Sequence, residues 1–241
     1  MGLHTADAIV LRRYPFRDTS VTVSVLTDRY GKLKGLIKGL RAQPNRYRSA
    51  MEPMTVNRIV FYDTRSSQLH LISQCELLAP LAALQQDLEV MRTAALCVDL
   101  ADAVVPLEDP QPLVYQLLRD TLERLTLGGS TVSLRIHFIS RLLRLAGFRP
   151  RLDECASCNT SVQATGYWSA AQGGLLCPPC LHEDPKAEHA SGQMLAALAA
   201  LSGQDHPPTL EEPVIGHVRR WLDEFLRWRL DKPLKTLASA Q

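Results

Sequence analysis

The sequence contains no apolar run long enough to cross a membrane. A transmembrane helix needs about 20 consecutive apolar residues, and the sequence holds no such stretch. Residues 1–7 lack the basic start and the apolar centre of a secretory signal peptide. We therefore expect a soluble, cytoplasmic protein. Disulfide bonds are rare in that compartment, so the six cysteines need another explanation.

The motifs of common enzyme classes are also absent. The sequence has no GxxxxGK[ST], GxGxxG, HExxH or GxSxG. Its seven histidines are scattered, and no two of them have the spacing of metal ligands. We therefore expect a protein that acts by binding and is not an enzyme. One alternative is an RNA-directed nuclease or modification enzyme, which would need a cluster of acids or histidines that we do not find.

Net charge is small but unevenly distributed. The whole chain carries a net charge of +2, with 27 Lys and Arg against 25 Asp and Glu. Residues 1–80 hold 12 basic and 6 acidic residues, a net of +6, which leaves 15 and 19, a net of −4, for the rest. This asymmetry suggests a polyanionic partner for the N-terminal part.

The N-terminal part is predicted to form a β-barrel. Val21, Val23 and Val25 alternate with polar residues, which is the pattern of a half-buried strand. Similar short segments predict five strands, over residues 5–12, 21–25, 32–38, 56–62 and 69–77. Five strands in an open sheet would leave unpaired edges, so a small closed or partly open barrel is expected.

Beyond Pro80, apolar residues recur every three or four positions, as on one face of a helix. Pro106, Gly128-Gly129 and Gly147 interrupt this pattern. The predicted helices cover about 81–102, 111–126, 130–146, 192–202 and 213–230. The expected fold is therefore α+β, with a barrel over 1–79, a helical domain over 80–149 and 191–241, and a cysteine-rich module inserted at 150–190.

Four cysteines form two CxxC motifs separated by 18 residues. This spacing is typical of a four-thiolate zinc site, in which two tight turns complete a tetrahedron with Zn–S bonds of about 2.3 Å. Four thiolates leave no position open for water, so one structural Zn²⁺ per chain is expected. Unligated buried cysteines or a redox dithiol are the alternatives, and no thioredoxin-like βαβ pattern supports the latter. The predicted ligands are Cys155, Cys158, Cys177 and Cys180, whereas Cys75 and Cys97 are expected to pack in the core.

A basic segment between residues 29 and 48 is the candidate nucleic-acid site. It holds seven basic residues and no acidic one. Cations can neutralise phosphates, and interleaved tyrosines can stack on bases. A solvated surface is the alternative. A second cluster precedes it, formed by Arg12, Arg13 and Arg17 with Tyr14 and Phe16. The candidate DNA-binding residues are Arg13, Arg29, Lys32, Lys34, Lys38, Arg41, Arg46, Arg48, Tyr30 and Tyr47.

Taken together, these pieces resemble the DNA repair protein RecO family over nearly the whole chain. The likeness rests on the order and spacing of several short segments. They are residues 19–26, Gly31-Lys32-Leu33 leading to 38–41, 113–118, 138–147 followed by Pro150, the two CxxC motifs, and the tail 232–236. Asn159, where family members often have Gly, and Thr236, where Ser is usual, are conservative departures.

The resemblance implies an N-terminal OB-fold, a helical domain and a zinc module. It implies a recombination mediator in DNA repair that binds single- and double-stranded DNA, anneals strands and associates with the nucleoid. It also implies cooperation with RecR and loading of RecA onto DNA coated by single-stranded-DNA-binding protein (SSB). The acidic SSB tail would dock on the helical domain, where Arg119, Arg135 and Arg141 could receive it. A zinc-ribbon adaptor that binds only proteins is the remaining alternative.

Overall fold

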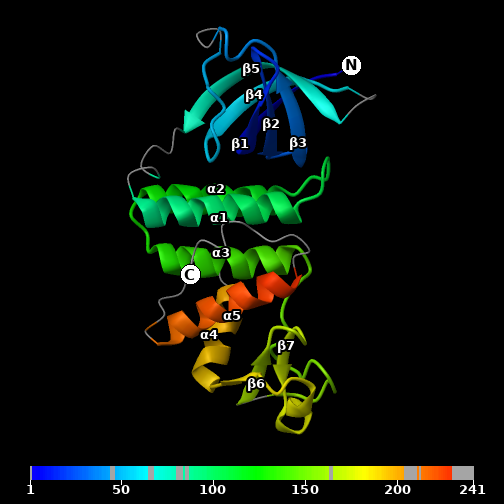
Figure 1. Cartoon of the computed structure of the whole chain (residues 1–241), viewed down its shortest axis with the longest axis vertical. Helices are drawn as coiled ribbons and strands as arrows, with labels where there is room; N and C mark the ends of the chain where they lie inside the picture. The colour runs from blue at the N-terminus through cyan, green and yellow to red at the C-terminus, as the bar shows by residue number, and fades with distance from the viewer. Residues whose placement is uncertain are drawn as a thin grey trace. The chain divides into compact units, whose positions relative to one another are not determined.

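The computed structural model describes residues 2–43, 47–64, 68–79, 84, 87–162, 165–203, 211 and 213–229. The chain divides into two compact units, Met1–Gly129 and Ser130–Gln241. The first unit holds a β-barrel and two helices, and the second holds three helices and a small sheet (Figure 1). No helix in the described ranges is long and apolar enough to span a membrane.

Five strands form a closed barrel in the order β1-β2-β3-β5-β4. All neighbours pair antiparallel except β3 and β5, which are parallel. A register shift between Val10 and Arg12 lets the long strand β1 pair with β4 along its first half and with β2 from Ala8 onward. The five-stranded barrel predicted from the sequence is therefore confirmed, with strands β1 (Leu3–Phe16), β2 (Ser20–Thr27), β3 (Lys32–Ile37), β4 (Val56–Tyr62) and β5 (Leu69–Ala79).

Alternation along the strands fills the barrel. Val21, Val23 and Val25 of β2 are almost completely buried, whereas the residues between them are only half-buried. Gly35 in β3 is required by close packing, because a Cβ there would lie 2.3 Å from Ile72 Cδ1. The segment between β3 and β4 also contributes Tyr47 and Met51 to the core. It is therefore packed against the barrel and not merely a surface connection.

Helices α1 (Leu88–Val104) and α2 (Pro112–Thr126) complete the first unit. Helix α1 begins at Leu88, where the Asp87 side chain accepts hydrogen bonds from the backbone N–H groups of Glu89 and Val90; residues 81–83, 85 and 86, which the sequence pattern assigned to this helix, lie outside the described residues. Near the other end of α1, Asp102 accepts from Arg12 Nε at 3.1 Å and lies 3.4 Å from Lys32 Nζ. These ion pairs fix α1 against the barrel.

The second unit is built from helices α3 (Thr131–Leu145), α4 (Gly192–Gly203) and α5 (Val214–Arg229). Between α3 and α4 lies a three-stranded sheet of order β7-β6-β8, which the sequence pattern did not predict. The sheet packs on α5 through Trp168, whose ring stacks on Trp221 at 5.4 Å between centroids. Its strands are β6 (Gly166–Ser169), β7 (Gly174–Leu176) and β8 (Glu188–Ala190), with the short 3-10 helix η3 (Pro178–Glu183) between β7 and β8.

Candidate metal centre and nucleic-acid interface

The two CxxC motifs converge in the second unit. Cys155 and Cys158 lie in the loop after α3, whereas Cys177 and Cys180 flank the start of η3. The first turn is closed by a hydrogen bond from Asn159 N to Cys155 O at 2.9 Å, and the second by Cys180 N to Cys177 O at 3.0 Å. Asn159 adopts φ +59°, a left-handed conformation that Asn tolerates.

The four sulfur atoms fit a tetrahedral metal site. All of them lie within 4.8 Å of one another, and the Cys158 and Cys177 sulfurs are 3.6 Å apart. A regular tetrahedron with Zn–S bonds of about 2.3 Å places its sulfurs about 3.8 Å apart. The cluster can therefore close on one ion with small adjustments, so the four predicted ligands lie close enough together to bind a metal ion.

The local hydrogen bonds favour a thiolate at Cys155. Burial opposes ionisation, but backbone N–H groups of Cys158, Cys177 and Ser157 donate toward the sulfur and lower its pKa to about 6. By contrast, hydrogen bonds with Cys177 and Cys158 raise the pKa of the Cys180 thiol to about 12. A bound metal ion would take the place of the hydrogen bonds among these thiols, because cysteines that bind a metal do so as thiolates.

The other two cysteines are buried in the first unit. Cys75 lies in β5 and Cys97 in α1, and both are at most 4% exposed. Burial raises the pKa of the Cys75 thiol to about 11. Both positions agree with the predicted packing role.

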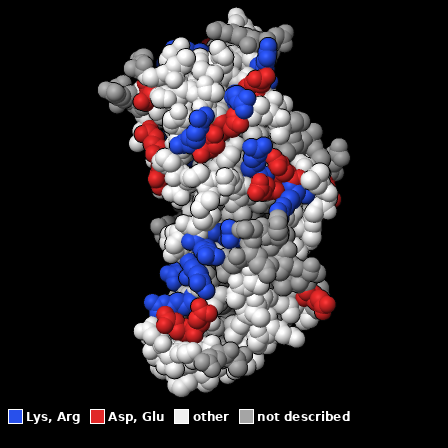
Figure 2. Space-filling view, turned by 180° about the vertical axis from the view of Figure 1, so that it is seen from behind, with Lys and Arg blue, Asp and Glu red and all other residues white. Residues whose placement is uncertain are grey.

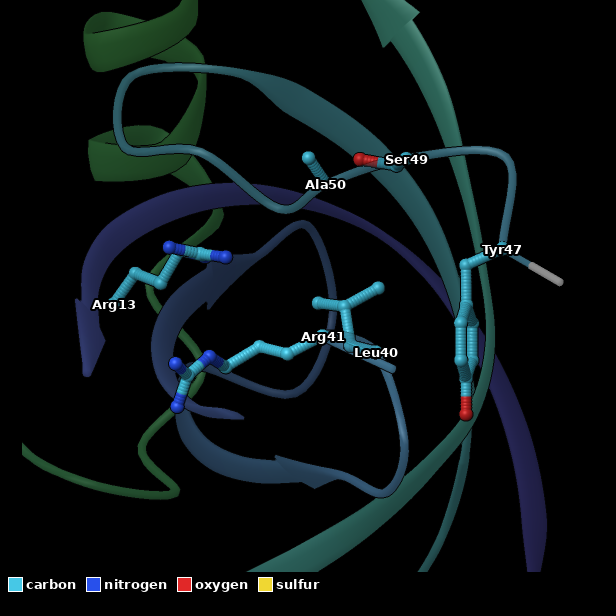
Figure 3. A pocket seen from close by; sticks show the side chains of 6 residues that line it. All are labelled: Arg13, Leu40, Arg41, Tyr47, Ser49 and Ala50. Atoms are coloured by element: carbon cyan, nitrogen blue, oxygen red, sulfur yellow. The ribbon is translucent and has the colours of Figure 1, made fainter. Parts of the chain in front are cut away.

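A hollow of about 390 Å³ opens on the barrel surface. It is bounded by β1 and by the segment between β3 and β4 (Figure 3). Arg13 and Arg41 extend into it on one side, the Tyr47 ring stands on the other, and Leu40 lies between them. Ser49 and Ala50 complete its lining. Three residues that the sequence analysis assigned to DNA binding are therefore brought together here.

Hydrogen bonds fix the walls of this hollow. Arg41 N donates to Thr19 O at 2.9 Å, and its guanidinium donates to Arg17 O at 3.3 Å, which ties the segment to the β1–β2 turn. The Tyr47 hydroxyl donates to Lys38 O at 2.7 Å. Arg13 lies 3.6 Å from Glu52, and its Nε is buried without a hydrogen-bond partner in the described part of the chain.

Two further predicted cations, Lys34 and Lys38, are exposed on or next to β3. Neither makes an ion pair with any residue in the described ranges. Lys38 is also joined to the hollow through the hydrogen bond from Tyr47. The barrel therefore carries two arginines that line the hollow, Arg13 and Arg41, and two exposed lysines on or next to β3.

The remaining predicted DNA-binding residues lie in other environments. Lys32 is only 13% exposed and is engaged by Asp102. Arg29 donates to Thr5 O at 2.9 Å, and Arg48 lies 3.4 Å from Glu76. Tyr30 packs against Phe61 in the barrel. Arg46 lies outside the described residues. On the face seen in Figure 2, the basic and acidic residues of the upper unit alternate, which reflects such pairing.

The three candidate partner-binding arginines are divided between the units. Arg119 belongs to α2 and pairs with Glu123 at 3.0 Å. Arg135 and Arg141 belong to α3. Arg135 is 12% exposed and its Nη2 lies 2.7 Å from both carboxylate oxygens of Asp223. The sequence reasoning missed this ion pair and those of Arg12 with Asp99 and Asp102, because the acids lie about 90 residues away along the chain.

Comparison with known proteins agrees with this architecture. Residues 1–81 match the family model for the N-terminal part of recombination protein O, and residues 85–238 match the model for its C-terminal part. The chain is 34% identical to DNA repair protein RecO of Moorella thermoacetica over 181 residues, which cover 74% of this chain and 67% of the relative. It is 31% identical to RecO of Desulforudis audaxviator over 201 residues, covering 83% and 80%. It is 30% identical to RecO of Symbiobacterium thermophilum over 247 residues, covering 98% and 96%. The chain therefore belongs to the RecO family of DNA repair proteins.

Proposed function

We propose that this chain is a non-catalytic recombination mediator that binds single- and double-stranded DNA on its barrel and anneals complementary strands. With RecR it would help to load RecA onto SSB-coated DNA, and it would receive the SSB tail on its helices. The observation that carries the proposal is the hollow that Arg13, Arg41 and Tyr47 line together. Membership of the RecO family supports the same reading.

The hollow suits a nucleic acid strand for physical reasons. The exposed part of the Arg13 guanidinium, which lines the hollow, could donate hydrogen bonds to a phosphate oxygen. The Arg41 guanidinium supplies a planar fork of donors that matches phosphate geometry. Tyr47 is only 9% exposed, so the ring would act as a wall and offer its edge to a sugar or base. Lys34 and Lys38 would add long-range attraction at the rim.

We also propose that Cys155, Cys158, Cys177 and Cys180 hold a structural Zn²⁺. The bound ion would supply a cross-link between the loop after α3 and the start of η3. The cysteines would hold it as thiolates, and the donors around Cys155 favour that state. Four sulfur ligands suit zinc and leave no position for a reacting water. Metal analysis of the purified protein tests this proposal, with one zinc per chain as the expected result.

A charge-reversal experiment tests the DNA-binding proposal. The variant Lys34→Glu/Lys38→Glu/Arg41→Glu removes three exposed cations of the barrel. We expect at least a tenfold weaker affinity for a fluorescent oligonucleotide, and a salt slope smaller by about two, since each lost phosphate contact contributes about 0.7 for a single strand. Arg92→Glu/Lys186→Glu/Arg219→Glu makes the same charge change at exposed positions elsewhere and serves as the control. Equal affinity and slope for the two variants would refute the assignment.

A further inference from the structure

The second unit carries another basic region that the proposed function does not use. From Arg124 to Leu152 the sequence holds six arginines and no acidic residue. Arg135 is withdrawn from the surface by Asp223. The other arginines of the second unit lie on α3 and in the segment that follows it. Figure 2 shows a band of basic atoms that ends beside a small acidic group. Such a band is expected to attract a polyanion.

The end of helix α3 fixes an aromatic ring within this region. Gly147 adopts φ +77° and Phe148 N donates to Leu143 O at 2.8 Å, which closes the helix with a left-handed turn. The turn leaves Phe148 43% exposed, next to the exposed Arg149 and four residues after the exposed Arg144. An exposed ring with cations on either side is the combination that stacks on bases and holds single strands.

Arg149 and Arg151 line a second hollow, of about 510 Å³. The Arg151 backbone pairs with Gly173 and Leu175, and its guanidinium donates to Asn159 Oδ1 at 2.6 Å. Asn159 directly follows the first CxxC motif, so the metal module holds this guanidinium in place. Preorganised side chains lose less conformational freedom when a ligand binds.

Two acids also line this hollow, and each lies near one of its two arginines. Asp153 lies 3.2 Å from Arg149 and is 80% exposed, and Glu154 lies 3.9 Å from Arg151 and is 49% exposed. Exposed pairs of this kind contribute little and exchange readily with other anions. A phosphate can therefore replace the carboxylates as partner of the two guanidinium groups.

We propose that Arg144, Phe148, Arg149 and Arg151 form a second single-strand site, so that one chain holds two DNA strands at once. This inference rests on the proposed function, because the first strand occupies the barrel. It supplies what annealing requires, since two strands that are held by one protein meet at a raised effective concentration. Neither site needs to recognise the base sequence, because both would contact the phosphate backbone and the faces of the bases.

The shape of the region favours a nucleic acid over an acidic peptide with an apolar end. The apolar hollow beneath Pro150, lined in part by Leu198 and Leu222, has a volume of only about 10 Å³. That is room for one water at most, and too little for an apolar side chain. The other hollow is lined mainly by charged and polar residues of both signs, and Pro150 and Leu152 are its apolar lining residues. The region therefore offers planar guanidinium groups, which match phosphates, and an exposed aromatic ring, which can stack on a base.

Native mass spectrometry of the full chain tests the inference. The protein is mixed with two non-complementary oligothymidines of different mass, each about 10 nucleotides long, within the range of a single OB-fold site. We expect complexes of one chain with both strands. The variant Arg144→Glu/Phe148→Ala/Arg149→Glu changes three exposed positions and should bind one strand only. We expect it to anneal complementary strands at least tenfold more slowly, as loss of about one stacked base would cause.

Three outcomes would overturn the inference: a native chain that never carries two strands, a variant that still carries both, or an acidic peptide that displaces the second strand at lower concentration than an oligonucleotide does. Arg144→Gln/Arg149→Gln, which removes charge without reversing it, should give an intermediate loss of the second strand. Failure of the proposed function gives a different result. In that case the barrel variant Lys34→Glu/Lys38→Glu/Arg41→Glu would bind DNA as the native chain does.

Discussion

The ion pair between Arg135 and Asp223 allows a prediction with a defined magnitude. Arg135 Nη2 lies 2.7 Å from both oxygens of Asp223, and the two side chains are 12% and 19% exposed. The Arg135 Nε is buried and has no hydrogen-bond partner in the described ranges. Asp223 therefore provides the main compensation for a positive charge that is largely withdrawn from solvent and joins α3 to α5.

Replacing Asp223 by Ala leaves this charge uncompensated. We expect the free energy of unfolding of the second unit to fall by about 3–5 kcal/mol, the usual effect of removing one member of a buried pair. This corresponds to a melting temperature lower by about 10 °C or more. By contrast, Arg135→Met/Asp223→Leu removes both charges and should remain within about 1 kcal/mol of the native protein. Urea unfolding followed by tryptophan fluorescence measures both values, because Trp221 lies on α5.

An exposed pair in the same unit provides the control. Arg149 lies 3.2 Å from Asp153, with side chains 49% and 80% exposed. Asp153→Ala should therefore cost less than about 1 kcal/mol. If Asp223→Ala were as mild as this control, the conclusion that Arg135 serves mainly to hold the helices together would be wrong.

Three further predictions concern the cysteine-rich module. Cys180→Ser removes one of four sulfur ligands, so elemental analysis should show clearly less zinc per chain than in the native protein; equal zinc content would contradict the site. Asn159→Ala should destabilise the module by about 1–2 kcal/mol because the residue is left-handed, whereas Asn159→Gly should cost less; calorimetry that ranks them in reverse would refute this. Burial opposes ionisation of Glu188, but hydrogen bonds from Trp221 and Arg220 lower its pKa. The ionised carboxylate therefore stabilises the fold above its unfolded pKa of about 4.3 and loses this effect as pH falls through the lower folded value. Glu188→Gln should be less stable than the native chain at pH 7, and the difference measured by urea unfolding should shrink below about pH 4.

The barrel could be predicted from the sequence because its signals are local. Val21, Val23 and Val25 alternate within one strand, and the same residues prove to be buried. The start of α1 was harder to predict from the sequence. The apolar period runs on through Leu88, and the structure adds the side-chain cap of Asp87, which a periodic pattern does not reveal.

The small sheet of the second unit could not be predicted, since β6, β7 and β8 have only three or four residues each. Segments of that length show no reliable period. The sheet owes its place to packing on α5 and to the two cysteine turns. The four cysteines themselves were predictable because spacing within each CxxC motif is a local property.

The basic segment shows where sequence reasoning reaches its limit. Charge density alone assigned Lys32 and Lys34, which are only two residues apart, to the same DNA-binding role. In the structure, Lys32 points to Asp102 of α1, whereas Lys34 is exposed. The difference depends on an acid 70 residues away along the chain, which no local pattern reveals. Arg12 and Arg135 are paired with distant acids in the same way.

Photocrosslinking tests the central claim, that DNA binds at the barrel, most directly. A strand containing iodouracil is bound to the full chain and irradiated, and the crosslinked peptides are identified by mass spectrometry. The account predicts crosslinks within residues 2–79, at Tyr47 in the hollow or at the exposed Tyr14 beside Arg13, and their loss at high salt. A crosslink pattern confined to residues outside the barrel would contradict it.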